Sequence, residues 1–382
     1  MNTRAQGLCD VARECNLESG IHPDPQNTRL LRQVIVTAVV RSIATANPPL
    51  YVTQEQAFEC YNKLFDLAPE ERELYRRILL DGRIRGRYVS MADTREAAID
   101  DTDALHGRFL KFGRAIAAKA ATEALDAAQA EPMEVRALVT NTCTGYLCPG
   151  MSSYLVEDLG LSSSIRVFDL MGMGCGGVLP NWDCAIGALR HGGPVLSVAF
   201  EVCSATLFMG NSPDLVVSNS IFGDGAAAAV LDRDGTAGIL RVLDCESGIS
   251  PSHREALHYR WEDGRLRNVL SRRVPVIGAR EIHKVAMRLL QRNGLGTADI
   301  RHWAVHPGGT VVIDRIAQKF GIEQDLLLPS RNIFAEYGNM SSPSVLFCLK
   351  EILEKTPPTP GDLGIMLTFG TGFTAFAALV EF

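Results

Sequence analysis

The sequence lacks the features that mark membrane, secreted or metal-binding proteins. None of its ten cysteines forms a C-x-x-C pair, and no group of cysteines and histidines has the spacing of a zinc site. The longest apolar runs, such as residues 34–40, are far too short to cross a bilayer. The first residues lack the apolar core of a signal peptide. We therefore expect a cytoplasmic protein with free thiols, no metal ion and no membrane span.

An excess of positive charge is also absent. The 382 residues carry 38 Lys and Arg against 44 Asp and Glu, so the formal net charge is −6. A nucleic-acid-binding role therefore has no electrostatic support from the chain as a whole. The hydrophobic fraction of 46% and the charged fraction of 21% are those of an ordinary globular protein, and the length predicts two domain-sized halves.

Short apolar runs alternate with amphipathic segments along the chain. This alternation predicts a layered α/β fold with mostly parallel strands. We expect a polar arm over residues 1–33, an N-terminal half over 34–237 and a C-terminal half over 238–382. The expected strands are 34–40, 135–140, 166–170, 194–200, 225–231, 301–305, 363–368 and 374–381, and the expected helices include 105–130, 178–190, 276–293, 311–320 and 344–355.

Cys175 lies among glycines between an expected strand and an expected helix. Glycines allow a sharp turn and leave space beside the sulfur. The positive end of the helix that begins near Val178 favours a thiolate, which predicts a lowered pKa and selective alkylation by iodoacetamide near neutral pH. A reactive thiolate fixed in a turn is a nucleophile for a carbonyl. The alternative is that Cys175 is a small buried apolar residue, as most free cysteines are.

A nucleophilic cysteine needs a proton acceptor, and His306 is the best candidate. It follows a short apolar strand and precedes Pro-Gly-Gly, a position where α/β folds often carry reactive groups. Asn339 follows a glycine and precedes a helix, and its amide could donate to a developing oxyanion. Taken singly, His306 is equally explained as a structural histidine and Asn339 as a residue at a helix entry.

The order of these three residues within their glycine motifs resembles the type III polyketide synthases, the chalcone and stilbene synthase superfamily. The resemblance covers residues 34–382. It implies a thiolase-like fold of five layers (αβαβα), built from two similar halves with mixed sheets. The motifs that carry it begin at Ser42 (SIATANPP), Met173 (MGC), Phe222 (FGDGA), His306 (HPGG), Gly338 (GNMSS) and Phe369 (FGTGF).

The resemblance implies a reaction and three catalytic residues. Cys175 would receive a starter acyl group from an acyl-CoA, with His306 as its ion-pair partner. His306 and Asn339 would stabilise the enolate that malonyl-CoA forms when it loses CO₂. The chain would be extended in several rounds and then cyclised or released. CoA thioesters are substrates here, and no further cofactor is expected.

Other positions take their roles from the same resemblance. Six arginines against two acidic residues between positions 72 and 87 form a basic segment, although a solvated helix face would look the same. The loop around Cys148 matches a family segment at the dimer interface, so we expect a homodimer. Phe208 resembles a gatekeeper between tunnel and cavity, with Leu207 as the alternative. Expected CoA-binding residues are Arg77, Arg83, Arg85, Gly308 and Gly309, and expected cavity residues are Cys143, Phe208, Gly370 and Phe373.

Three other functions remain open at this point. A single-round β-ketoacyl synthase of the fatty-acid-initiating type also uses Cys, His and Asn. A hydroxymethylglutaryl-CoA synthase would need a catalytic glutamate, for which Glu201 is a candidate by its order in the chain. A non-catalytic acyl-binding protein with this fold would release no CoA when mixed with acyl-CoA.

Overall fold

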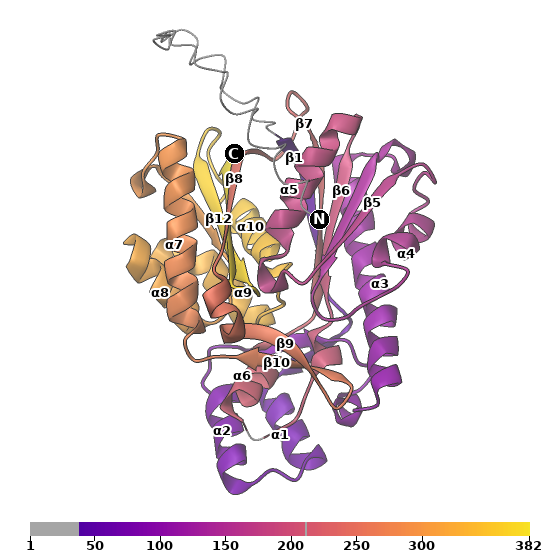
Figure 1. The fold of residues 1–382 in the computed structure, drawn as a ribbon, viewed down its shortest axis with the longest axis vertical. Coiled ribbons are helices and arrows are strands. Elements are labelled where there is room, and N and C mark those ends of the chain that lie inside the picture. Colours follow the sequence, from indigo (N-terminus) through magenta and orange to yellow (C-terminus); the bar gives the residue numbers. More distant parts are fainter. Residues whose placement is uncertain (1–37, 211) are drawn as a thin grey trace, which may run out of the picture. The chain divides into compact units, whose positions relative to one another are not determined.

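A mixed nine-stranded sheet organises the chain (Figure 1). The computed structural model describes residues 38–210 and 212–382, so the expected arm over 1–33 lies outside the described residues. The strand order is β11-β12-β13-β8-β1-β7-β6-β4-β5, and two separate two-stranded sheets are formed by β2 with β3 and by β9 with β10. The strands are β1 (Ala38–Ala46), β2 (Leu50–Thr53), β3 (Gly86–Val89), β4 (Ala137–Thr142), β5 (Arg166–Met171), β6 (Val195–Glu201), β7 (Gly225–Arg233), β8 (Leu240–Ile249), β9 (Leu257–Glu262), β10 (Arg265–Leu270), β11 (His302–Val305), β12 (Leu363–Gly370) and β13 (Thr374–Glu381).

The expectation of mostly parallel strands is wrong. Parallel pairing occurs in β4–β5, β4–β6 and β11–β12, where intervening helices return the chain to the same end of the sheet. The pairs β1–β7, β1–β8, β8–β13, β12–β13 and β6–β7 are antiparallel. The alternation of elements in the sequence could not show that β1 lies between β7 and β8, or that a three-residue turn joins β12 to β13.

The helices lie in three layers, and the two parts of the sheet lie between them. Helices α5 and α10 pack together with β4, β6, β12 and β13 in one core, whereas α3 covers β1, β6 and β7 and α7 covers β8 and β13. This gives the expected order αβαβα. The helices are α1 (Gln54–Leu64), α2 (Pro69–Leu79), α3 (Thr102–Ala128), α4 (Met151–Asp158), α5 (Val178–Ala188), α6 (Pro213–Ile221), α7 (Val274–Arg292), α8 (Thr310–Phe320), α9 (Leu328–Tyr337) and α10 (Ser344–Lys355).

Small side chains bring α3 close to the sheet. Ala117, Ala120 and Ala124 are fully buried on the face of α3 that contacts β1 and β7. The Ser42 hydroxyl on β1 donates to the Ala124 carbonyl at 2.6 Å. A helix rich in alanine also has a high intrinsic helix propensity, so local preference and packing agree in this segment.

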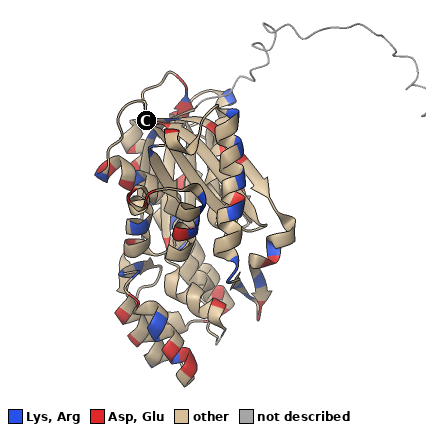
Figure 2. Ribbon diagram, turned by 90° about the vertical axis from the view of Figure 1, so that its left-hand side faces the viewer, with Lys and Arg blue, Asp and Glu red and all other residues tan. Residues whose placement is uncertain are grey.

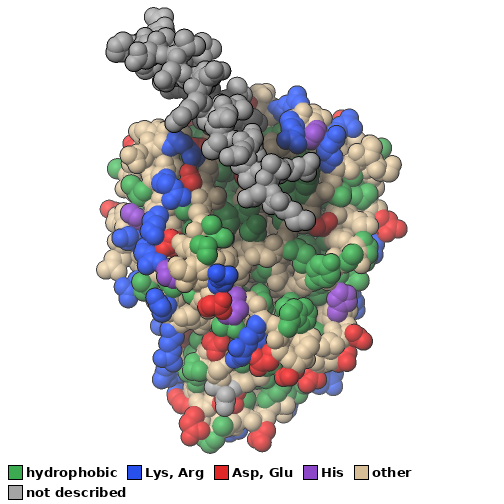
Figure 3. All heavy atoms as spheres, in the orientation of Figure 1, with side chains coloured by type: hydrophobic (Ala, Val, Ile, Leu, Met, Phe, Trp, Pro, Cys, Tyr) green, Lys and Arg blue, Asp and Glu red, His purple; other side chains and the backbone are tan. Residues whose placement is uncertain are grey.

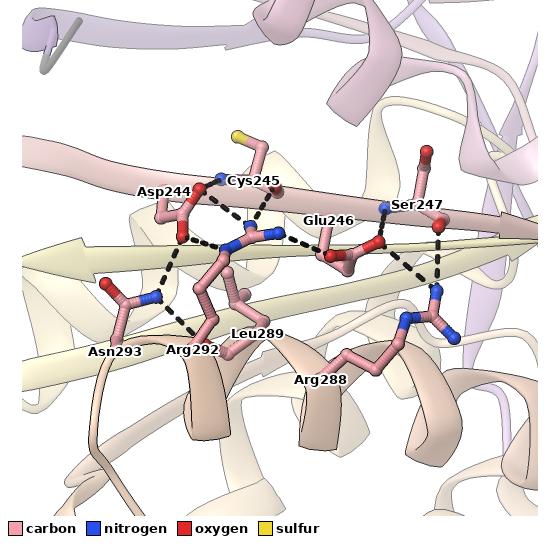
Figure 4. A network of polar contacts seen from close by, with 8 residues as sticks. All are labelled: Asp244, Cys245, Glu246, Ser247, Arg288, Leu289, Arg292 and Asn293. Atoms are coloured by element: carbon pink, nitrogen blue, oxygen red, sulfur yellow. Dashed lines mark hydrogen bonds and ion pairs between the residues drawn. The ribbon is translucent and has the colours of Figure 1, made fainter. Parts of the chain in front are cut away.

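Charged residues lie mainly on helices and loops, whereas most of the sheet carries none (Figure 2). Basic side chains gather along the left edge of the view in Figure 3, the side on which α7 and α8 lie in Figure 1. Two arginines of α7 bond to acidic residues of β8 (Figure 4). Arg292 bonds to Asp244 at 2.9 Å and to Glu246 at 2.7 Å, and Arg288 bonds to Glu246 at 3.2 Å. Arg288 and Arg292 are four residues apart on a helix, and Asp244 and Glu246 are two residues apart on a strand. Each pair therefore lies on one face of its element.

Candidate active site

Cys175 lies in the turn that joins β5 to α5. The short 3-10 turn Gly174–Gly176 holds it just before the first residue of α5, and its side chain is buried. The turn between β12 and β13 packs against this segment so closely that a Cβ on Gly370 would lie 1.9 Å from the Met173 carbonyl oxygen. Gly370 therefore supports the backbone before the nucleophile, although the resemblance assigns it to the cavity wall.

Asn339 is held by the glycine turn that follows α6. Its backbone N–H donates to the Ile221 carbonyl at 2.8 Å, and its carbonyl accepts from Gly223 at 3.0 Å. Gly338 has φ +65°, and a Cβ there would lie 2.4 Å from the Ile221 oxygen, so only glycine fits. The Ser341 N–H donates to Asn339 Oδ1 at 2.8 Å, which leaves the amide NH₂ free to face Cys175. A hydrogen bond from Asn339 acts on the Cys175 sulfur and favours its thiolate.

His306 directly follows the last residue of β11. Its ring packs edge-on against Phe369, with ring centroids 6.0 Å apart. The Phe369 carbonyl carbon lies 3.2 Å from the position of a Cβ on Gly176, so Phe369 borders both the histidine and the turn that holds Cys175. The Phe373 ring stacks on the Phe369 ring, with the two centroids 5.4 Å apart. Both ring nitrogens of His306 are buried and have no partner among the described residues.

Burial decides the charge of both groups in the free protein. It raises the pKa of the Cys175 thiol to about 12, and the carboxylate of Glu201 adds to that rise. Burial also lowers the pKa of His306 to about 3. The lowered cysteine pKa expected from the helix N-terminus is therefore wrong, because desolvation of a buried thiolate outweighs the helix dipole. The resting site holds a neutral thiol and a neutral imidazole.

A cavity of about 780 Å³ leads toward these residues from the surface. Arg77, Arg83, Gly308 and Gly309 line it, as the resemblance implies for CoA. Gly308 also borders His306, since a Cβ on this glycine would lie 3.4 Å from the imidazole Cδ2. The cavity therefore reaches from the basic residues in and after α2 to Gly308, which borders the catalytic candidate His306.

Comparison with known proteins identifies the family. Residues 44–238 match the FAE1/type III polyketide synthase-like proteins, and residues 245–381 match the C-terminal domain of chalcone and stilbene synthases. The chain belongs to the type III polyketide synthases. It is therefore an acyltransferase that condenses acyl-CoA starters with malonyl-CoA, and the single-round β-ketoacyl synthase alternative is set aside.

Two curated relatives and one solved structure illustrate this similarity. The 3,5-dihydroxyphenylacetyl-CoA synthase of Amycolatopsis balhimycina is 34% identical over 67% of this chain and 70% of its own length. The enzyme of the same name from Streptomyces toyocaensis is 29% identical over 94% and 97%. The fold matches 1,3,6,8-tetrahydroxynaphthalene synthase from Streptomyces coelicolor A3(2) with a TM-score of 0.84 and 22% identity, covering 90% of this chain and 99% of the other.

The structure of this type III polyketide synthase does not bring all predicted residues together. Arg85 pairs with Glu336 at the surface and is not among the residues that line the cavity. Phe208 is buried beneath the Arg265 guanidinium, 4.4 Å from its ring centroid, and lines none of the cavities described. Cys143 lies beside the site, with its sulfur 3.3 Å from the Ser341 hydroxyl. Arg272 also lines the cavity and was missed, although the Arg-Arg pair ahead of α7 was a signal.

Glu201 is the buried acid of this polyketide synthase site, and sequence reasoning gave it only as a candidate for another reaction. It is fully buried at the end of β6. Its carboxylate accepts hydrogen bonds from the Cys143 N–H at 2.9 Å and from the Ser342 hydroxyl at 2.6 Å. The Met-Ser-Ser run after Asn339 was the available signal for this network.

The raised pKa of Cys175 makes a kinetic prediction. Because only the thiolate reacts with iodoacetamide, Cys175 in the free enzyme should react more slowly at pH 7 than a free cysteine thiol. The rate should keep rising with pH beyond pH 9. Peptide mass spectrometry of samples quenched over time measures this rate. A rate that levels off below pH 7 would show a lowered pKa and contradict the assignment of a neutral resting thiol.

No helix among the described residues is long and apolar enough to cross a membrane.

Proposed function

We propose that Cys175, His306 and Asn339 carry the decarboxylative condensation of this enzyme. The observation that supports this most is that the Asn339 amide bonds to the buried Cys175 thiol, while the unpartnered His306 imidazole borders Gly308 in the wall of a cavity lined by arginines. Each of the three comes from a different part of the chain. CoA thioesters are the substrates, and the cycle needs no other cofactor.

The first half-reaction loads the enzyme. The Cys175 sulfur attacks the carbonyl of a starter acyl-CoA while its proton moves to a ring nitrogen of His306. The new C–S bond forms, the bond to CoA breaks, and the departing CoA thiolate takes the proton back from His306. Charge separation between thiolate and imidazolium is transient, which agrees with the neutral forms of both residues in the free protein.

The second half-reaction extends the chain. The bond between the malonyl carboxylate and its α-carbon breaks, CO₂ leaves, and the electron pair forms an enolate on the remaining thioester. The Asn339 NH₂ and the His306 N–H donate to the enolate oxygen. The α-carbon then attacks the Cys175 thioester, a C–C bond forms, and the sulfur leaves as the thiolate, which takes a proton from water. The extended chain is now on CoA and reloads Cys175 as in the first half-reaction. Repetition of these steps, followed by cyclisation or release, gives the product.

The class of product follows from one experiment. We expect the enzyme, incubated with malonyl-CoA and a panel of short, aromatic and long-chain acyl-CoAs without carrier protein, to give products extended by two or more ketide units. Mass spectrometry counts those units. Products that never exceed one unit, or that need an acyl carrier protein, would remove the polyketide assignment in favour of a single-round synthase.

The cavity arginines should set the affinity for CoA substrates. Arg77 has no ion-pair partner among the described residues, so its charge is available to a CoA phosphate. Arg77→Ala should raise the KM for malonyl-CoA about tenfold with little change in kcat, the size of one lost hydrogen bond to a charged group. Arg85→Ala is the matched control, because Arg85 is committed to Glu336 outside the cavity lining. Equal KM effects of the two substitutions would contradict the assignment.

A homodimer in the cytoplasm is the proposed working form. β5 is the edge strand of the large sheet, and Val167, Met171 and Tyr146 near this edge are 45%, 37% and 63% exposed. An edge strand with exposed apolar side chains is a template for pairing with another chain. The free thiol of Cys148 is exposed in the loop after β4. Val167→Lys should halve the mass seen by analytical ultracentrifugation, and a wild-type monomer would refute the dimer.

A further inference from the structure

A chain of buried hydrogen bonds runs beneath the turn that holds Cys175. It links β6, α5, β4 and the segment before α10, and each member is at most 2% exposed. The reaction proposed above uses none of its members. In order, they are Ser197, Asn181, Asn141, Ser342 and Glu201.

The backbone fixes the direction of this chain at one end. Asn181 Nδ2 donates to the Val139 carbonyl at 3.0 Å, and a carbonyl can only accept. The same NH₂ group donates to Asn141 Oδ1 at 2.9 Å, while Asn181 Oδ1 accepts from the Ser197 hydroxyl at 2.7 Å. The orientation of the Asn181 amide therefore follows from Val139 and does not depend on Ser197.

This direction passes on to Glu201. Since Asn141 Oδ1 faces a donor, Asn141 Nδ2 must face Ser342, to which it donates at 2.9 Å. The Ser342 oxygen accepts that hydrogen bond, so its own hydrogen goes to Glu201 Oε1 at 2.6 Å. Glu201 Oε1 therefore accepts a hydrogen bond from the Ser342 hydroxyl.

The other carboxylate oxygen is committed in the same way. Glu201 Oε2 accepts from the Cys143 backbone N–H at 2.9 Å and from the Thr144 hydroxyl at 2.9 Å. The Thr144 oxygen itself accepts from the Val202 N–H at 2.9 Å, so its hydrogen points to Glu201. The Thr142 and Ser341 hydroxyls also donate to Glu201, at 3.1 Å to Oε2 and at 3.4 Å to Oε1, so donors surround both carboxylate oxygens.

We propose that Asn141 and Asn181 are positioning residues, which orient the Ser342 hydroxyl and thereby hold Glu201 as an ionised carboxylate beside Cys175. Asn141 also touches the nucleophile turn itself, because a Cβ on Gly177 would lie 2.8 Å from its Nδ2. The relevance of this proposal to catalysis rests on the proposed role of Cys175 as the nucleophile. The charge of Glu201 can be measured without any turnover.

A fixed negative charge at this place affects every ionisable group around it. Burial raises the pKa of Glu201 on balance, and the hydrogen bonds from Ser342, Cys143 and Thr144 reduce that rise by stabilising the ionised form. The carboxylate in turn opposes a second negative charge nearby, so it keeps the surrounding groups protonated in the resting enzyme. The groups whose pKa it raises are Cys143, Cys175, Cys203 and Tyr259.

The test is a pH titration of Glu201 in each variant, monitored by infrared spectroscopy. The carboxyl signal of Glu201 is isolated as the difference between spectra with and without the additional substitution Glu201→Gln. In the wild type we expect an ionised carboxylate at pH 7. Asn141→Leu, which keeps the size of the side chain, frees the Ser342 hydroxyl to rotate and should move the titration of Glu201 to higher pH by about one unit. Ser342→Ala should move it at least as far and covers the case that Asn141→Leu does not fold.

Ser197→Ala is the matched control. Ser197 is equally buried and belongs to the same chain, but the Val139 carbonyl already orients Asn181, so this variant should titrate like the wild type. A purely structural role of the chain would give similar shifts in all three variants. The proposal is overturned by a protonated Glu201 in the wild type at pH 7, by an unchanged titration in Asn141→Leu, or by an equal shift in Ser197→Ala.

Discussion

Cys175→Ala is expected to lower the rate of chain extension at least about 10³-fold, since it removes the atom that carries the acyl group. Decarboxylation of malonyl-CoA should persist, because the His306 imidazole and the Asn339 amide that stabilise the enolate remain in place. Alanine fits the buried site without a clash. Release of labelled CO₂ and formation of polyketide, measured in the same sample, separate the two activities.

Cys184→Ala is the control for this substitution. Cys184 is a free, partly buried thiol on α5, the helix that begins just after Cys175. Its loss should leave extension within about twofold of the wild type, because surface and partly buried substitutions away from a site have small effects. Extension that survives in Cys175→Ala, or fails in Cys184→Ala, would contradict the role of Cys175.

Asn339→Ala is expected to lower the decarboxylation of malonyl-CoA about 10²- to 10³-fold, the usual cost of one oxyanion donor. The backbone of residue 339 should stay in place, because it is bonded to Ile221 and Gly223 and the preceding Gly338 is unchanged. Extension should fall by at least the same factor, since the enolate is its nucleophile. This combined loss differs from the result expected for Cys175→Ala.

Asn332→Ala provides the comparison for Asn339→Ala. Asn332 is an exposed residue of α9 that donates to Glu351 at 3.1 Å. It has no role in the proposed reaction. It should decarboxylate malonyl-CoA at the wild-type rate. An Asn339→Ala enzyme that also kept the full rate would falsify the donor role of the amide and leave His306 as the remaining candidate.

The sequence was sufficient to predict most helices and strands, and it singled out three residues whose catalytic roles stay a prediction. Helices 178–190 and 344–355 and strands 363–368 and 374–381 were expected within a few residues of α5, α10, β12 and β13. These elements are buried and strongly patterned, so periodicity identifies them. Cys175 and Asn339 were singled out because each lies next to a glycine, and His306 because it follows an expected strand and precedes Pro-Gly-Gly.

Properties that depend on distant contacts could not be predicted in this way. A lowered pKa of Cys175 was inferred from the local helix, whereas burial raises this pKa and Glu201, distant in the chain, adds to the rise. Arg85 and Phe208 lie in suitable segments, but Glu336 and Arg265 hold them away from the cavity. The hydrogen bonds of Asn141 and Asn181 join β4 to α5 and left no pattern in either segment.

Trapping of the acyl-enzyme tests the central claim most directly. The enzyme is mixed with an acyl-CoA, quenched in acid and digested, and the peptides are weighed, first without and then with malonyl-CoA. We predict the starter acyl mass on the peptide that contains Cys175, followed by masses increased by whole ketide units on the same peptide. Acyl groups found on Cys143 alone, or on no cysteine while polyketide still forms, would contradict the account.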